Sequence, residues 1–132
     1  QVARLTGMDV ANASMYDGAT ATAEAVLMAK RITNRPHIHI HGSLHPQYRE
    51  VIETYISTYP ELAIKDGAPD DKTSCVIVQT PDFHGHPQNL ESLRKQCSEN
   101  GALLVVVVNE ILSLGLLPAP KEADIVLSLI HI

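Results

Sequence analysis

The feature that most constrains the fold is a run of seven aliphatic residues, Ala102-Leu-Leu-Val-Val-Val-Val108. A strand that faces water on one side alternates apolar and polar side chains, whereas a continuous apolar run is typical of a central parallel strand covered on both faces. A second run, Cys75-Val-Ile-Val-Gln-Thr80, is ended by Pro81 and indicates another buried strand. Together the two runs predict a parallel sheet with helices on both sides.

Three other segments have the patterns of helices. Asp17 is a favourable N-cap for the first, Pro46 suits the first turn of the second, and Asn100-Gly101 provides the left-handed cap that closes the third. Apolar residues three and four positions apart in the second segment give it one buried face. We expect helices over residues 17–33, 46–58 and 88–99.

The rest of the chain gives shorter or weaker signals. Alternation in His37-Ile-His-Ile-His41 predicts a short strand. Further short strands are expected at 61–65 and 123–126, a polar loop at 66–74, and no clear structure at 109–117. Strands that alternate with helices predict an α/β fold, a three-layer sandwich around a mostly parallel sheet, in which ligands bind beyond the carboxyl ends of the strands.

Composition limits the kinds of partner. The chain has 132 residues, enough for one core, and its formal net charge of -5 with scattered Lys and Arg offers no basic stripe for nucleic acid. The longest apolar run is far short of the roughly 20 residues that cross a bilayer, so we expect no membrane span. Cys75 and Cys97 form no Cys-x-x-Cys pair, so they are expected to be buried free thiols of a cytoplasmic protein.

Small and hydroxyl-bearing residues are concentrated over residues 12–22, where a loop leads into the first predicted helix. The amides of a helix N-terminus carry a partial positive charge, so residues such as Ser14 and Thr20 can cradle a phosphate there. Asp17 places a negative charge beside that position and favours a plain N-cap role instead. In the alternative interpretation, Ser14 and Tyr16 line an interface or a cleft.

A second candidate loop follows the strand at 75–80, in the segment Val78-Gln-Thr-Pro-Asp-Phe-His-Gly85. Loops at the carboxyl ends of strands are where α/β folds place functional residues, which makes Asp82 and Phe83 candidates. The alternative is a connection to the next helix that contacts no ligand.

Histidines form the third feature. The strand at 37–41 places three imidazoles on one face, which is in principle a metal-ligand geometry. No Asp or Glu lies nearby at a matching spacing, and a solvent-facing strand would show the same pattern. We therefore expect no metal site, and a metal-dependent hydrolase is the least favoured function. The histidines in question are His37, His39 and His41, joined loosely by His45, His84 and His86.

Several segments resemble one known family, the P protein of the glycine cleavage system. Asn12-Ala-Ser-Met-Tyr-Asp-Gly-Ala-Thr-Ala21 matches a segment of the alpha subunit of the two-subunit enzyme almost residue for residue. Val78–Gly85 resembles Val-Gln-Tyr-Pro-Asn-Phe-x-Gly, with Thr80 in place of the aromatic residue and Asp82 in place of Asn. Shorter matches bring the resemblance to nearly all of residues 5–126, namely His45-Pro-Gln-Tyr-Arg49, Leu114-Gly-Leu-Leu117 and Ala123-Asp-Ile-Val126.

The resemblance implies part of the large domain of an aspartate-aminotransferase-like, type I pyridoxal-phosphate fold. In this family the enzyme decarboxylates glycine and passes the aminomethyl group to the lipoyl arm of the H protein. The resemblance also implies that the beta subunit supplies the lysine that binds pyridoxal phosphate covalently, so that the alpha subunit is active only with its partner. The contacts it suggests at the cleft or the interface are Asn12, Ser14, Met15, Tyr16, Asp17, Asp82 and Phe83.

Lysine carries particular weight here because a pyridoxal enzyme needs one to form the Schiff base. None of the five lysines, Lys30, Lys65, Lys72, Lys95 and Lys121, stands in the Ser-x-His-Lys context of such enzymes. Motifs of serine nucleophiles and phosphate-binding loops are absent as well. The alternative to the decarboxylase subunit is a non-catalytic α/β scaffold or binding domain of the same fold.

The chain departs from the family in two places and at its ends. Residues 60–74 are fewer than usual, since a further helix commonly precedes the strand at 75–80, and Asn109-Glu-Ile111 replaces a turn that usually contains Asp-Pro. The chain opens on Gln1 and is predicted to be an internal fragment. Its last six residues, Leu127-Ser-Leu-Ile-His-Ile132, look like a translated sequencing adapter, so we expect the native domain to cover 1–126.

Overall fold

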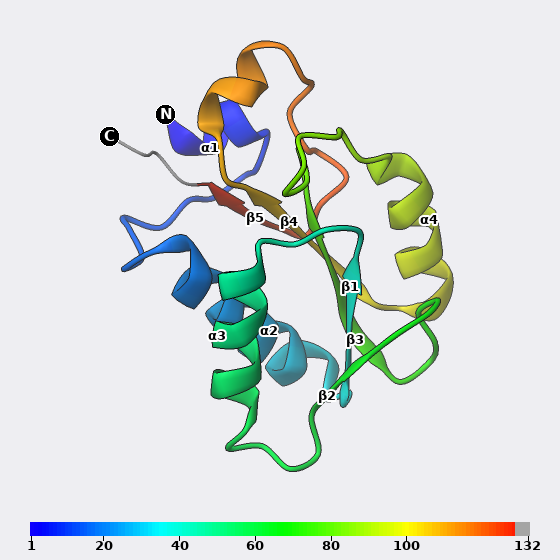
Figure 1. Cartoon of the computed structure of the whole chain (residues 1–132). Helices are drawn as coiled ribbons and strands as arrows, with labels where there is room; N and C mark the ends of the chain where they lie inside the picture. The colour runs from blue at the N-terminus through cyan, green and yellow to red at the C-terminus, as the bar shows by residue number, and fades with distance from the viewer. Residues whose placement is uncertain (129–132) are drawn as a thin grey trace.

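Five parallel strands form one sheet in the computed structural model, which describes residues 1–128 (Figure 1). The order across the sheet is β2-β1-β3-β4-β5, and each neighbouring pair is parallel. The strands are β1 (His37–His41), β2 (Ala63–Lys65), β3 (Thr73–Gln79), β4 (Leu103–Val108) and β5 (Ile125–Ser128). The parallel sheet predicted from the two apolar runs is confirmed.

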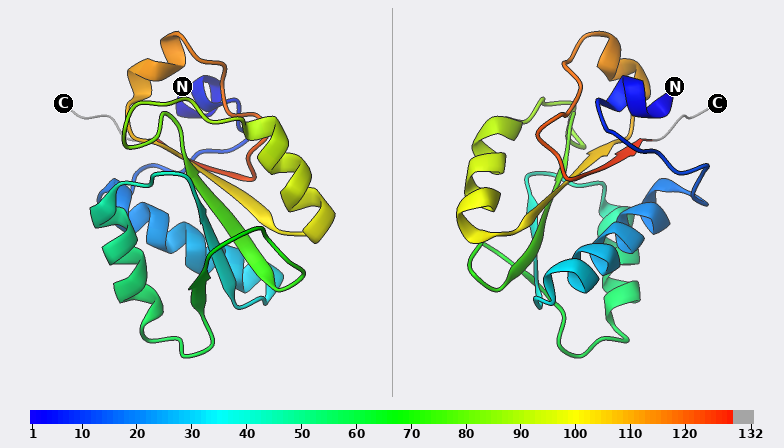
Figure 2. Two further views of the ribbon diagram at one scale, coloured as in Figure 1. Left: turned by 45° about the vertical axis from the view of Figure 1, so that its right-hand side comes forward. Right: turned by 180° about the vertical axis from the view of Figure 1, so that it is seen from behind.

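Helices cover both faces of the sheet, as Figure 2 shows, with α2 and α3 on one side and α4 on the other. The predicted three-layer sandwich is therefore confirmed. A short N-terminal helix and a 3-10 helix, neither of them expected from the sequence, lie side by side beyond one end of the sheet. The helices are α1 (Val2–Thr6), α2 (Gly18–Thr33), α3 (Pro46–Ile56), α4 (Leu90–Asn100) and the 3-10 helix η1 (Ile111–Gly115).

The sheet separates two apolar cores, and this explains the continuous runs in the sequence. In β3, Cys75 and Ile77 face α2 and α3, while Val76 and Val78 face α4, so every residue of the strand is buried. Burial raises the pKa of the Cys75 thiol to about 12 and that of Cys97 to about 11. Both cysteines are free and buried, as expected, and neither is a reactive thiolate.

The start predicted for β3, Cys75, is two residues later than the observed start at Thr73, because the first two residues of the strand are polar. Thr73 and Ser74 are fully buried in the strand, where their hydroxyls are satisfied. The Thr73 hydroxyl donates to Asp70 Oδ1 at 2.8 Å, and the Ser74 hydroxyl donates to the His37 carbonyl at 2.8 Å. The predicted loop at 66–74 therefore ends at Lys72.

Other boundaries differ for similar local reasons. Helix α4 begins two residues later than predicted, because the Gln88 amide donates to Thr80 Oγ1 at 3.2 Å and Asn89 caps the helix. Strand β5 begins after Asp124, whose carboxylate accepts from the Leu104 amide at 2.7 Å and from Arg94 at 2.6 Å. Asp124 thereby joins the start of β5 to both β4 and α4.

The hypothesis of a non-native tail falls partly on described residues. Leu127 and Ser128 complete β5, and Leu127 packs against the core beneath α2 and α3. Residues 129–132 lie outside the part that the structure describes, and the boundary at residue 126 stays a prediction. Within residues 1–128, no helix has the length and apolar content needed to cross a membrane.

Candidate functional site: the carboxyl edge of the sheet

Two hollows open at the carboxyl edge of the sheet, where α/β folds bind ligands. The first has a volume of about 240 Å³ and lies between the end of β3, the start of α4 and the segment after η1. The second, of about 330 Å³, lies between the loop after β1, the start of α3 and the loop after β3. Chief among the lining residues are Thr80, Val108 and Leu117 in the first, and Ile40, Pro46 and Phe83 in the second.

The loop that precedes α2 is an exposed strap. Every residue from Asp9 to Asp17 is exposed, including the large side chains of Met15 and Tyr16, which are 44% and 94% exposed. Asn12 and Ser14 lie in the same strap and are exposed as well. Nothing in the described chain covers this segment, so these side chains are available for contact with another molecule.

Asp17, by contrast, is engaged by its own helix. Its Oδ1 accepts from the Thr20 amide and from the Thr20 hydroxyl, each at 2.7 Å, and the pair forms a capping box at the N-terminus of α2. These hydrogen bonds from Thr20 hold the pKa of Asp17 below its usual range. The N-cap role predicted for Asp17 is confirmed, and its carboxylate occupies the place where a phosphate would meet the helix amides.

Asp82 has a comparable role in the loop after β3. Its Oδ1 accepts from the backbone amides of His84 and His86, both at 2.9 Å, and its Oδ2 accepts from Gln88 Nε2 at 3.3 Å. The pKa of Asp82 is lowered, chiefly by the amide of His86. Its side chain therefore organises the turn of this loop.

Phe83 connects the second candidate loop to the start of α3. Its ring is half-exposed and meets His45 edge to face at 5.0 Å between centroids, and His45 in turn contacts Tyr48 at 5.2 Å. Burial raises the pKa of Tyr48, and the negative charge of Asp17 raises it further. Phe83 therefore packs the loop after β3 against the start of α3.

Sequence reasoning missed the residues that hold this edge together. Gln79 is buried at the end of β3, where its Oε1 accepts from the His45 amide at 2.9 Å and its Nε2 donates to the Pro81 carbonyl at 3.2 Å. One side chain therefore fixes the loops on both sides of the second hollow. An amide at the end of an otherwise aliphatic strand was the available signal. Asn109 Oδ1, just past β4, is buried without a hydrogen-bond partner among residues 1–128.

The histidines do not form the arrangement that the strand pattern suggests. His37 and His39 lie together near the amino end of β1, whereas His41 is exposed at the other end of that strand. The sequence has no Asp or Glu at a matching spacing, but the fold brings Asp70 from another loop to 3.3 Å from His37 Nδ1. His84 and His86 belong to the loop after β3, where the His84 ring lies 5.5 Å from that of Phe83.

The lysines all lie in the described part of the chain, and none lines either hollow. Lys30, for example, pairs with Glu61 at 3.3 Å near the C-terminal end of α2, the end opposite Asp17. No group in either hollow could therefore form an imine with a carbonyl compound.

Comparison with known proteins gives consistent matches over almost the whole chain. The family described as glycine cleavage system P-protein matches residues 1–129. A "probable glycine dehydrogenase (decarboxylating) subunit 1" of Rhodospirillum centenum is 52% identical, and one of the same name from Methylocella silvestris is 50% identical. Each match covers 96% of this chain and 31% of the relative, so the chain spans about a third of these relatives.

Both matches run over 139 residues, more than the 132 of this chain, so these relatives have residues without a counterpart here. That agrees with a chain shorter than its relatives, while the position of the difference at 60–74 stays a prediction. Among solved structures, an inhibitor-bound crystal structure of glycine decarboxylase (P-protein) superposes with a TM-score of 0.87 at 37% identity. That match covers 96% of this chain and 31% of the solved chain, and it confirms the predicted fold class. The chain belongs to the family of the glycine cleavage system P-protein.

Proposed function

We propose that the protein is the alpha subunit, or subunit 1, of glycine decarboxylase, the half that lacks the imine-forming lysine. With its partner it would decarboxylate glycine and pass the aminomethyl group to the lipoyl group of the H protein. The similarity to relatives named subunit 1 supports this role. The observation that carries it is the match to these relatives over 96% of this chain at 50 to 52% identity.

The enzyme family depends on pyridoxal phosphate. The residues at the start of α2 do not fit the cofactor's phosphate, because the Asp17 carboxylate accepts from the helix amide that a phosphate would need. Two negative charges at one helix N-terminus would repel each other. From the similarity to relatives named subunit 1, we propose that the beta subunit binds the cofactor covalently.

The residues of this chain would act by shaping the shared cleft. Asn12, Ser14, Met15 and Tyr16 are the exposed contacts of the strap, and Phe83 is the half-exposed contact of the second loop. Asp17 and Asp82 would hold those two loops in place through the hydrogen bonds described above. Glycine and the lipoyl arm would then enter between the two subunits.

Reconstitution tests the proposal. The full-length protein is mixed with the beta subunit of the same system, pyridoxal phosphate and lipoylated H protein, and glycine-dependent exchange of labelled bicarbonate is measured. We expect exchange only when both subunits are present. Lys→Ala variants at all five lysines of this segment should retain exchange, whereas the same change at the Schiff-base lysine of the beta subunit should abolish it.

Two results would contradict the proposal. The first is an imine between the full-length protein alone and pyridoxal phosphate, seen as an absorption band that borohydride reduces and fixes to the chain. The second is association of the two subunits without any exchange, under conditions in which a known enzyme shows exchange. The second result would favour the scaffold of the same fold.

A further inference from the structure

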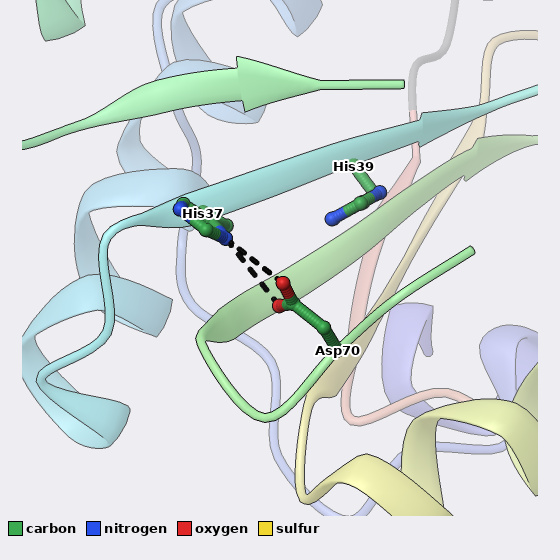
Figure 3. A group of neighbouring side chains, drawn as sticks. All are labelled: His37, His39 and Asp70. Atoms are coloured by element: carbon green, nitrogen blue, oxygen red, sulfur yellow. Dashed lines mark hydrogen bonds and ion pairs between the residues drawn. The ribbon is translucent and has the colours of Figure 1, made fainter. Parts of the chain in front are cut away.

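We propose that His37, His39 and Asp70 form a binding site for a divalent transition metal ion, with Zn²⁺ as the best-suited metal. Each residue offers one ligand atom, and the three atoms lie within 4.8 Å of one another (Figure 3). Two imidazole nitrogens and one carboxylate oxygen are a donor set that zinc accepts. This inference is independent of the decarboxylase proposal, because no residue of the cluster lines either hollow.

The strongest observation concerns the two nitrogens of His39. Its side chain is buried, with 4% of the residue exposed, and its Nδ1 lies 3.3 Å from the Gly67 carbonyl oxygen. A carbonyl only accepts, so Nδ1 carries the hydrogen and Nε2 is left with a bare lone pair. Nε2 is buried and has no hydrogen-bond partner among the described residues.

That arrangement is the one that metal-binding histidines usually have. Such a histidine donates its other ring N–H to a carbonyl or carboxylate, which fixes the tautomer and aims the lone pair at the metal. Figure 3 shows the outer end of the His39 ring turned toward His37 and Asp70. A buried lone pair without a partner is unfavourable for folding, and a bound cation would satisfy it.

Asp70 is held in position by its own loop. Its Oδ1 accepts from the Thr73 hydroxyl at 2.8 Å and from the Lys72 amide at 3.0 Å. Those two bonds fix the orientation of the Asp70 side chain. Its Oδ2 contacts only His37 among the described side chains and is open to a further ligand.

The spacing of these atoms suits tetrahedral coordination. His37 Nδ1 lies 3.3 Å from each Asp70 oxygen. Two ligands about 2.0 to 2.1 Å from a tetrahedral zinc ion are separated by about 3.3 to 3.4 Å, since the edge of a tetrahedron is about 1.63 times the bond length. The ligand atom of His39 lies within 4.8 Å of the other two, so the third edge closes when that atom moves toward the ion. The half-exposed side of Asp70 leaves room for water as the fourth ligand.

The position in the fold indicates a structural site. His37 is the first residue of β1, at the amino edge of the sheet, whereas ligands that react in α/β folds bind at the carboxyl edge. The ion would bind the loop 66–72 to β1 and offset the mutual repulsion of its three aspartates, Asp66, Asp70 and Asp71. The face of the sheet near β1 is covered here by that loop, and α4 packs against β3 and β4.

Metal titration of the protein tests the site. After treatment with a chelator, the protein is titrated with Zn²⁺ by calorimetry and with Co²⁺ by visible absorption, which is intense only in tetrahedral coordination. We expect one ion per chain, and slower hydrogen exchange in the loop 66–72 when zinc is present. His37→Gln and Asp70→Asn should each weaken zinc binding at least about tenfold, since even residues that only support metal ligands have effects of that size.

His41→Gln is the matched control, because His41 lies on the same strand but outside the cluster. It should bind zinc as the unchanged protein does. His39→Gln provides a third variant, and if the loss of this buried ring prevents folding, the two variants at the partly exposed positions still decide the question. A protein that takes up no zinc, or a His41→Gln variant weakened as much as His37→Gln, would overturn the proposal.

Discussion

Gln79 is the residue on which the geometry of the carboxyl edge most depends. It is almost fully buried, and its one amide bonds to the loops after β1 and after β3. Replacing it with leucine keeps the volume but leaves the His45 amide and the Pro81 carbonyl without this partner. We expect Gln79→Leu to lower the free energy of unfolding by about 1 to 3 kcal/mol, the usual cost of unpaired buried polar groups.

Urea denaturation followed by circular dichroism measures this change. Gln47→Leu, the same substitution at an exposed position of α3, is the control and should stay within about 0.5 kcal/mol of the unchanged protein. An equal loss in both variants would mean that the bridging amide has no special role in stability.

Asp17 gives a prediction about pH. Its pKa is lowered in the folded chain from a usual value of 3.8, because Thr20 donates to its carboxylate. A lowered pKa stabilises the fold at pH values above the unfolded pKa, and this contribution is lost as the pH falls through the folded pKa. Asn is an equally good N-cap but does not titrate.

We therefore expect the stability of the unchanged protein, relative to Asp17→Asn, to fall as the pH is lowered from about 5 to below 3.8. The measurement is the urea midpoint of both proteins at a series of pH values. A difference that stays constant over that range would show that the bonds from Thr20 do not depend on the charge of Asp17.

At the scale of elements, the sequence predicted best where burial alone decides the structure. The aliphatic runs of β3 and β4 and the Asp17-capped α2 could be found because one local pattern determined each of them. The first two residues of β3 were missed because Thr73 and Ser74 are polar, and their partners, Asp70 and the His37 carbonyl, become visible only in the fold.

The histidine strand shows the same limit more clearly. Alternation alone fitted both a metal-binding face and a solvent-facing strand, and it could not show that His39 is buried beneath the loop 66–72. Gly67 and Asp70 are 28 and 31 residues away from His39 in the sequence, so no spacing rule could connect them. Likewise, the pattern at the end of β3 pointed to Asp82 and Phe83, while Gln79 required knowledge of both loops that it joins.

At the scale of the whole molecule, exposed apolar side chains are unevenly distributed. Of the ten large hydrophobic residues described as exposed, seven lie in residues 2–16 or in η1 and the residue after it. Figures 1 and 2 show α1 and η1 side by side, with the strap leading away from them. Exposed apolar surface concentrated in one region favours association with another protein, or self-association when that partner is missing.

We therefore expect the 132-residue chain to self-associate through this region when it is studied without a partner. Tyr16 and Leu116 are each 94% exposed, so the double variant Tyr16→Ser and Leu116→Ser should leave the free energy of unfolding within about 0.5 kcal/mol per site while reducing self-association. Sedimentation velocity over a range of concentrations measures the association. The control is the pair Met28→Ser and Ile32→Ser, which removes exposed apolar side chains from the outer side of α2. If the control pair reduced self-association as strongly, the effect would reflect surface hydrophobicity in general. The proposal that the strap and η1 form the interface would then be wrong.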